Sequence, residues 1–264
     1  MSLTKITSVV TVVVSLVIFS CGPELADKEY ELIEQAKVFE DEGDFKNTLK
    51  AYKKLLNKYP ESTYSHEALF KIGSSYFYMN DFDETSETFR QQFNNNPSGK
   101  FDSVARLMIE CGEDNKITEE ELLTLAQICE VGAVYEEAIK ACKRKLNDFP
   151  HSMTSDETIE RIAFIYYNNI HDFKKAIVYH ERLIKDYPES EFVSRARFMI
   201  GFIYANNLEN YELAKQCYNE FLELHPESEL SESVKWELEH LGQDVNSQLD
   251  DLFGNEKSND KSTK

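Results

Sequence analysis

Apolar residues recur at the three- and four-residue spacing of amphipathic helices through most of residues 29–226. Several of these apolar stretches begin at an aromatic residue and stop at a proline fifteen positions later. Five such pairs occur: Phe45 with Pro60, Phe82 with Pro97, Tyr135 with Pro150, Phe173 with Pro188, and Tyr211 with Pro226. Proline cannot continue a helix because it lacks an amide hydrogen and disfavours helical geometry at the preceding residue. Each pair therefore predicts one helix.

A second helix is predicted in front of each of these, because small residues recur there at a fixed place. Gly73 and Gly201 stand thirteen residues after Pro60 and Pro188, with Ala163 at the same place in its unit, and a tyrosine follows three residues later. Glycine inside a helix costs about 1 kcal/mol relative to alanine. Its return at the same place indicates that two helices approach closely there.

The junctions between units also share a pattern. Three of them read aromatic or His, then Pro-Glu-Ser, and end at Ser62, Ser190 and Ser228. Serine is a preferred N-cap residue, so these serines are expected to cap the next helix.

This order of small residue, aromatic, turn, aromatic and proline resembles the tetratricopeptide repeat. The second unit carries the pattern through Leu69, Ile72, Gly73, Tyr76, Phe82, Phe89 and Pro97, with Thr85 where alanine is usual. The resemblance implies an all-α fold, a right-handed solenoid of about five helix pairs. It also implies a protein-binding groove lined by the first helices.

The solenoid is expected to be irregular in its middle. Successive prolines stand 37, 53, 38 and 38 residues apart, and the 53-residue interval predicts an extra helix at 101–111. Unit three has Cys129 and Cys142 at the usual aromatic positions, so an altered twist or a hinge is expected between residues 97 and 150. Residues 229–241 predict a C-terminal capping helix.

The N-terminus predicts a membrane anchor. An apolar run from Val9 to Phe19 is shorter than the approximately 20 residues that span a bilayer, which indicates a signal peptide. Residues 18–21 resemble the lipobox of bacterial lipoproteins, which implies lipidation of Cys21, the alternative being an ordinary secreted protein cut nearby. By the same resemblance, Gly22 implies the outer membrane, with the chain facing the periplasm.

These patterns give the expected division of the chain. It comprises a signal peptide at 1–20, a lipidated linker at 21–28, repeats one and two at 29–97, an inserted helix and loop at 98–117, repeats three to five at 118–226, a capping-helix region at 227–253 and a disordered tail at 254–264.

Charge and motifs exclude several function classes. Lys and Arg total 29 against 48 Asp and Glu, and the formal net charge of -19 is expected to repel phosphate backbones and anionic lipid headgroups, which disfavours nucleic acid as a partner. The six histidines are scattered, and no HExxH, GxSxG or phosphate-binding glycine loop occurs. No catalytic residue, metal, cofactor or small-molecule substrate is therefore predicted.

Four cysteines remain after Cys21. Small buried hydrophobes are the favoured interpretation, and a disulfide between Cys129 and Cys142 stays open because both fall in unit three.

Function is predicted to reside in the groove. The resemblance to tetratricopeptide arrays gives these candidate groove residues: Phe70, Ser74, Phe77, Glu157, Glu160, Phe164, Tyr167, Arg195, Phe198 and Phe202. The six aromatic residues among them suggest a docking site for protein partners, while the alternative is that the long repeat turns some of them into core.

The long repeat and its Tyr-Pro-Glu-Ser junctions resemble the BamD-like lipoproteins of the outer-membrane β-barrel assembly machine. That resemblance implies a periplasmic scaffold in β-barrel protein assembly. The alternative is a scaffold lipoprotein for another envelope process, such as cell-wall synthesis, division or secretion.

Overall fold

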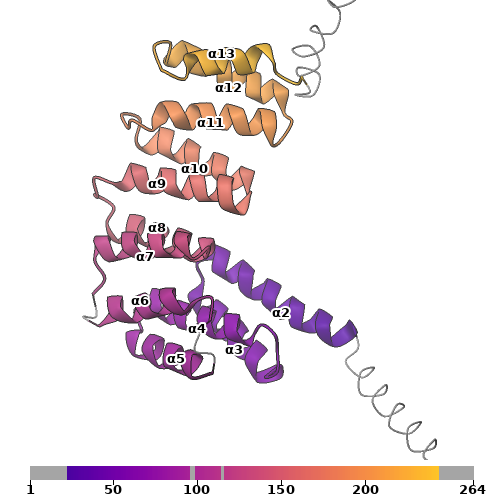
Figure 1. Ribbon diagram of the computed structural model, residues 1–264, viewed down its shortest axis with the longest axis vertical. Coiled ribbons are helices and arrows are strands. Elements are labelled where there is room, and N and C mark those ends of the chain that lie inside the picture. Colours follow the sequence, from indigo (N-terminus) through magenta and orange to yellow (C-terminus); the bar gives the residue numbers. More distant parts are fainter. Residues whose placement is uncertain (1–22, 96–98, 114–115, 244–264) are drawn as a thin grey trace, which may run out of the picture. The chain divides into compact units, whose positions relative to one another are not determined.

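The computed structural model describes residues 23–95, 99–113 and 116–243. Over these residues the chain forms twelve α-helices and one short π-helical segment, with no strand (Figure 1). The predicted all-α class is confirmed. The chain divides after Val134 into two compact units, unit 1 and unit 2.

Unit 1 contains two helix pairs followed by two further helices. Its helices are α2 (Pro23–Glu42), α3 (Phe45–Lys58), α4 (Ser65–Tyr78), α5 (Phe82–Asn95), α6 (Asp102–Gly112) and α7 (Glu119–Val131). Each packs against the next in sequence, and α6 also packs against α4. The extra helix predicted at 101–111 is α6.

Unit 2 begins with the second helix of repeat three. Its helices are α8 (Tyr135–Asp148), α9 (Ser155–Ile165) with the π-helical η1 (Tyr166–Ile170), α10 (Phe173–Asp186), α11 (Val193–Asn206), α12 (Tyr211–Leu224) and α13 (Ser231–Glu239). α9 pairs with α10 and α11 with α12, and α13 packs on α12 as the predicted capping helix.

The second helix of every repeat begins at the aromatic residue that the sequence pattern singled out, which is the first residue of α3, α5, α8, α10 and α12. The boundary between the units falls between α7 and α8, inside the region expected to be irregular. The altered twist or hinge expected there stays a prediction.

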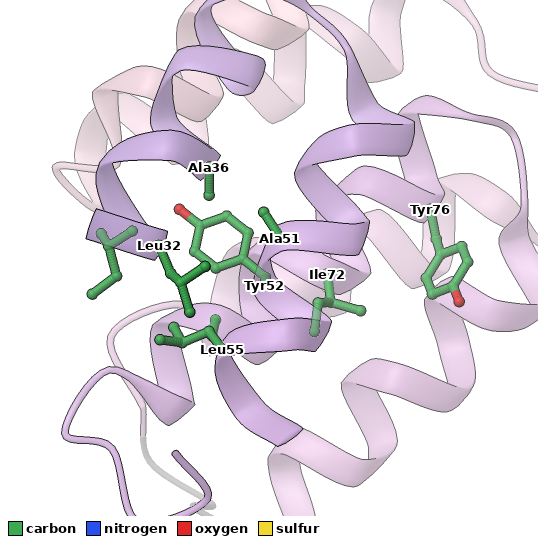
Figure 2. Close-up of a cluster of buried hydrophobic side chains, with 9 residues drawn as sticks. Leu32, Ala36, Ala51, Tyr52, Leu55, Ile72 and Tyr76 are labelled. Atoms are coloured by element: carbon green, nitrogen blue, oxygen red, sulfur yellow. The ribbon is translucent and has the colours of Figure 1, made fainter. Parts of the chain in front are cut away.

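Each unit has its own apolar core. In unit 1, Figure 2 shows Tyr52 of α3 among small and aliphatic side chains that include Ala36 of α2 and Ile72 of α4. In unit 2, Tyr218 and Phe221 of α12 pack with Val234 of α13, and all three are fully buried. The cores therefore lie between helices that are neighbours in sequence.

The small residues in the first helices have the packing role expected of them. A Cβ atom on Gly201 would lie 2.6 Å from Cε1 of Tyr218, and one on Gly73 would overlap the ring of Phe89. Tyr218 and Phe89 occupy the same place in their repeats, seven residues after the aromatic that begins the second helix. Glycine thus makes room for a large ring on the partner helix.

The turns inside the helix pairs share one backbone geometry. The residue two before each second helix has a positive φ: Gly43 (73°), Asn80 (62°), Ala133 (54°), His171 (61°) and Glu209 (51°). In four turns the next side chain then accepts a hydrogen bond from the amide three residues on, in the pairs Asp44–Asn47, Asp81–Glu84, Asp172–Lys175 and Asn210–Leu213. Val134 has no acceptor, so the turn of repeat three lacks this cap.

The junction serines act differently from the expectation. The hydroxyls of Ser62 and Ser190 accept hydrogen bonds from the amides of Tyr64 (3.0 Å) and Phe192 (3.2 Å), and Ser228 does the same for Leu230. These partners are themselves the N-cap residues, which make no side-chain cap. The serines therefore stabilise the turn before the helix rather than the helix terminus.

The four cysteines after residue 21 are thiols in this structure. Cys111, Cys129 and Cys142 are buried, as expected of small hydrophobes, and Cys217 is half-buried.

Several predictions fall outside the described residues. They concern the signal peptide at 1–20, Cys21, Pro97 and the tail at 254–264. Within the described part of the chain, none of the helices has the length and apolar content needed to span a bilayer.

Candidate partner-binding site

Seven of the ten predicted groove residues lie on α9, η1 and α11 of unit 2. They are Glu157, Glu160 and Phe164 on α9, Tyr167 on η1, and Arg195, Phe198 and Phe202 on α11. We call this set the α9–α11 face. Because α9, α10 and α11 follow one another through short turns, α9 and α11 run in the same direction.

An ion pair joins the two helices of this face. The Nε and Nη2 atoms of Arg195 both donate to Oε1 of Glu160, at 3.0 and 2.7 Å. The other carboxylate oxygen of Glu160 lies 3.3 Å from Nδ1 of His180 on α10. Glu160 and His180 are buried, whereas the Arg195 side chain is 54% exposed. The carboxylate of Glu160 on α9 thus contacts side chains of both α10 and α11.

The position of Glu160 has opposing effects on its ionisation. Burial raises the pKa of the Glu160 carboxyl, but the nearby His180 ring and the Arg195 guanidinium more than offset this effect and hold the pKa below its ordinary value. Glu160 is therefore a carboxylate at neutral pH, and it fixes the direction of the Arg195 guanidinium.

The aromatic residues of the face follow the ion pair along both helices. Phe164 lies one turn after Glu160 and is 51% exposed. On α11, the rings of Phe198 and Phe202 stand 5.8 Å apart, and Phe198 also lies 6.2 Å from the buried ring of Tyr218. Both α11 rings are half-buried. The face therefore presents apolar rings beside the half-exposed guanidinium of Arg195, which Glu160 keeps in position.

Tyr167 owes its place to the π-helical segment. η1 inserts a wider turn after α9, and the chain leaves it through His171, whose φ is 61°. The Tyr167 ring stands 5.9 Å from Phe173 at the start of α10 and is half-buried. π-helical turns of this kind are rare and are frequent at functional sites. Glu157, one turn before Glu160, is exposed beside Arg161.

The three candidates in unit 1 lie elsewhere. Phe70, Ser74 and Phe77 are buried in the core. The ring of Phe101, at the start of the inserted helix α6, stacks on Phe70 at 4.3 Å, and Phe77 packs edge-on against Phe82 at 6.0 Å. Because α6 packs on α4, these side chains do not line an open surface and are not part of the candidate site.

Sequence reasoning missed His180. At its place in the repeat, units one, two and five have Tyr52, Phe89 and Tyr218, so an aromatic core residue is the norm and His180 departs from it. That departure is the signal that could have found it, since a buried polar residue needs a polar partner. The partner, Glu160, was predicted to face a groove and not a histidine.

No group of three or more His, Cys, Asp or Glu side chains that could hold a metal ion occurs in the part of the chain that the structure describes. Aromatic rings and guanidinium groups, such as the exposed Phe164 ring and Arg195, commonly anchor protein partners. The expectation that this protein is not an enzyme stays a prediction.

Comparison with known proteins identifies the repeat. Residues 32–62, 67–98 and 195–228 match the tetratricopeptide-repeat family. These segments correspond to the α2–α3, α4–α5 and α11–α12 helix pairs. These three helix pairs of the chain are therefore tetratricopeptide repeats. No curated protein matches the chain as a relative.

Solved structures of other proteins are similar at low identity. The MamA protein is 18% identical over 75% of this chain and 92% of its own, with a TM-score of 0.34. A tetratricopeptide-repeat protein from Parabacteroides merdae is 14% identical over 80% of this chain and 72% of its own, with a TM-score of 0.34. The TPR2AB domain of yeast Sti1, solved as a complex with pHSP90, is 14% identical over 81% of this chain and 86% of its own, with a TM-score of 0.36.

Proposed function

We propose that this protein is a lipid-anchored scaffold that binds a segment of a partner protein along the α9–α11 face. The observation that carries the proposal is the pairing of Arg195 with buried Glu160 beside the exposed ring of Phe164. A guanidinium held in advance loses little conformational freedom when a partner binds, and an aromatic ring supplies apolar contact area.

The geometry suggests what such a segment carries. Arg195 uses Nε and Nη2 for Glu160, which leaves Nη1 for a carboxylate or carbonyl oxygen of the partner. Phe164, with the half-buried rings of Phe198 and Phe202, would take one or two apolar side chains of the same segment. A short segment with an acidic group and neighbouring apolar residues fits this face best.

The finer part of the proposal concerns place and process. The apolar run before Cys21 and the lipobox-like residues 18–21 support a lipid anchor at Cys21 and a position in the outer membrane, facing the periplasm. The long repeat and the Pro-Glu-Ser junctions support a role like that of BamD-like lipoproteins in β-barrel protein assembly. Other envelope processes remain the alternative.

The test of the binding face is capture of companions from the native host. The tagged wild type would be compared with a Phe164→Ala/Phe202→Ala variant, and we expect the variant to retain at most about a tenth of the companion. A matched control removes two exposed apolar side chains elsewhere, Val131→Ala/Met153→Ala, at residues that are 90% and 98% exposed. Equal loss of the companion protein in both variants, or no loss in either, would refute partner binding at the α9–α11 face.

The same preparation tests the finer proposal. Mass spectrometry of the N-terminus is expected to show an acylated Cys21 as the first residue, and the companions are expected to include a β-barrel assembly protein. An unmodified N-terminus would refute the anchor. Recovery of cell-wall enzymes alone would refute β-barrel assembly while leaving the binding face intact.

A further inference from the structure

One helix of unit 1 departs from the acidic character of the chain. α3 contains five lysines and not one Asp or Glu between residues 45 and 58, although the whole chain has a formal net charge of -19. The lysines are all exposed: Lys46, Lys50, Lys53, Lys54 and Lys58. We call them the lysine face.

The lysine face is largely unneutralised. Lys53 donates a hydrogen bond to the hydroxyl of Tyr76 at 2.5 Å, and Lys58 lies 5.2 Å from the ring of Tyr59. Lys46, Lys50 and Lys54 form no ion pair with any residue that the structure describes. They stand four residues apart, the spacing at which like charges on a helix repel each other. The arrangement therefore favours an anionic partner from outside the chain.

The surface between these lysines suits a broad partner. The lysine stems and the partly buried Leu49 line a wide, shallow hollow of about 620 Å³. From Lys46 to Lys58 the face extends about 18 Å at the helical rise per residue. A flat array of charge over this length matches several small anionic groups side by side better than one enclosed ligand.

The face lies near the expected lipid. The hydroxyl of Ser62, four residues after α3, donates a hydrogen bond to the carboxylate of Glu29 on α2, which brings the end of α3 close to the first turns of α2. Glu29 is about 9 Å along the helix from Pro23, where α2 begins, and Cys21 is two residues before it. A lipid on Cys21 would hold the Lys58 end of the face close to the bilayer.

We propose that the lysine face binds the anionic headgroups of the membrane in which Cys21 is anchored. This inference rests on the proposed lipid anchor, and it adds a second, electrostatic membrane contact that orients unit 1. Lysine ammonium groups near an anionic lipid surface attract it additively, and the attraction is screened by salt. An acidic protein segment is the other occupant that the charge would fit, but nothing places one beside Cys21.

The test uses residues 22–264, which include every described residue and carry no lipid. Sedimentation would measure binding to vesicles of two parts phosphatidylcholine and one part phosphatidylglycerol, and to vesicles of phosphatidylcholine alone. We expect binding to the anionic vesicles only, its loss at high salt, and a partition coefficient at least about tenfold lower for Lys46→Gln/Lys50→Gln/Lys54→Gln. Circular dichroism would establish that the variant is folded.

A matched control removes the same charge from unit 2 through Lys174→Gln/Lys185→Gln/Lys215→Gln, three other exposed lysines, and should bind as the wild type does. Equal loss in both triple variants, or binding of polyglutamate in place of vesicles, would overturn the proposal. Capture of companion proteins by the Lys46→Gln/Lys50→Gln/Lys54→Gln variant distinguishes headgroup binding from the proposed function. An intact α9–α11 face should capture its companion whether or not the lysine face binds vesicles.

Discussion

Gly201 on α11 lies directly against the ring of Tyr218 on α12, and a methyl group on Gly201 would stand 2.6 Å from Cε1 of that ring. Tyr218 is fully buried and cannot give way freely. The Gly201→Ala variant is therefore expected to lose about 1–3 kcal/mol of unfolding free energy. Helix propensity alone predicts the opposite, a gain of about 1 kcal/mol.

Urea denaturation followed by circular dichroism would measure this change. Ser194→Ala on the same helix is the control, since Ser194 is half-buried and lies seven residues before Gly201, and it should change the free energy by less than about 0.5 kcal/mol. A Gly201→Ala variant more stable than the wild type would contradict the packing account.

The carboxylate of Glu160 should make stability depend on pH. Because the folded protein holds the pKa of Glu160 below its ordinary value of 4.5, ionised Glu160 stabilises the fold above that pH. The contribution is lost as pH falls through the lowered pKa. The Glu160→Gln variant should lose about 1–3 kcal/mol at neutral pH, and its difference from the wild type should shrink at acidic pH.

Urea midpoints of both proteins, measured from neutral pH down to about pH 3, would show this convergence. Glu157→Gln is the control, because Glu157 is an exposed residue one turn away, paired at 3.8 Å with Arg161. A Glu160→Gln difference that stays constant over the whole range would exclude the proposed linkage.

The turn before α12 contains avoidable backbone strain. Glu209 has a φ of 51°, a conformation that costs a residue with a side chain about 1 kcal/mol relative to glycine. The Glu209→Gly variant should therefore raise the melting temperature. The reverse change at the same place in repeat one, Gly43→Ala with a φ of 73°, should lower it. Differential scanning calorimetry of both variants tests the pair, and a loss of stability in Glu209→Gly would refute the explanation.

The cysteine thiols should react slowly in the folded protein. Burial raises the pKa of the half-buried Cys217 thiol, and the nearby carboxylates of Glu220 and Glu181 raise it further, so little thiolate is present. In residues 22–264, a thiol reagent should modify Cys217 slowly and the three buried cysteines more slowly still. Four thiols should react at once in denaturant. Fewer than four would reveal a disulfide and contradict the structure.

Much of the fold could be predicted because it is encoded locally. A proline stops each second helix, and the aromatic residue fifteen positions earlier begins it, so the bounds of α10 and α12 follow from Phe173, Pro188, Tyr211 and Pro226. The recurring glycines likewise indicate a local feature, the close approach of two helices that follow one another in sequence.

The candidate site was only partly predictable, because its contacts join residues that no periodic pattern relates. Phe70 was assigned to a groove, but the inserted helix brings Phe101 onto its ring at 4.3 Å. The partnership of Glu160, His180 and Arg195 spans three helices, and spacing along one helix cannot show which polar side chains meet across several. The lysine face needed the structure to show that its charges stay exposed.

Within each unit, most of the packing joins helices that follow one another along the chain. Such a topology needs few distant encounters, so folding can start at one hairpin and spread to the next. During synthesis, α2 and α3 can therefore dock before α12 has left the ribosome. A nascent scaffold of this design would become resistant to proteases progressively, from its N-terminal helices onward.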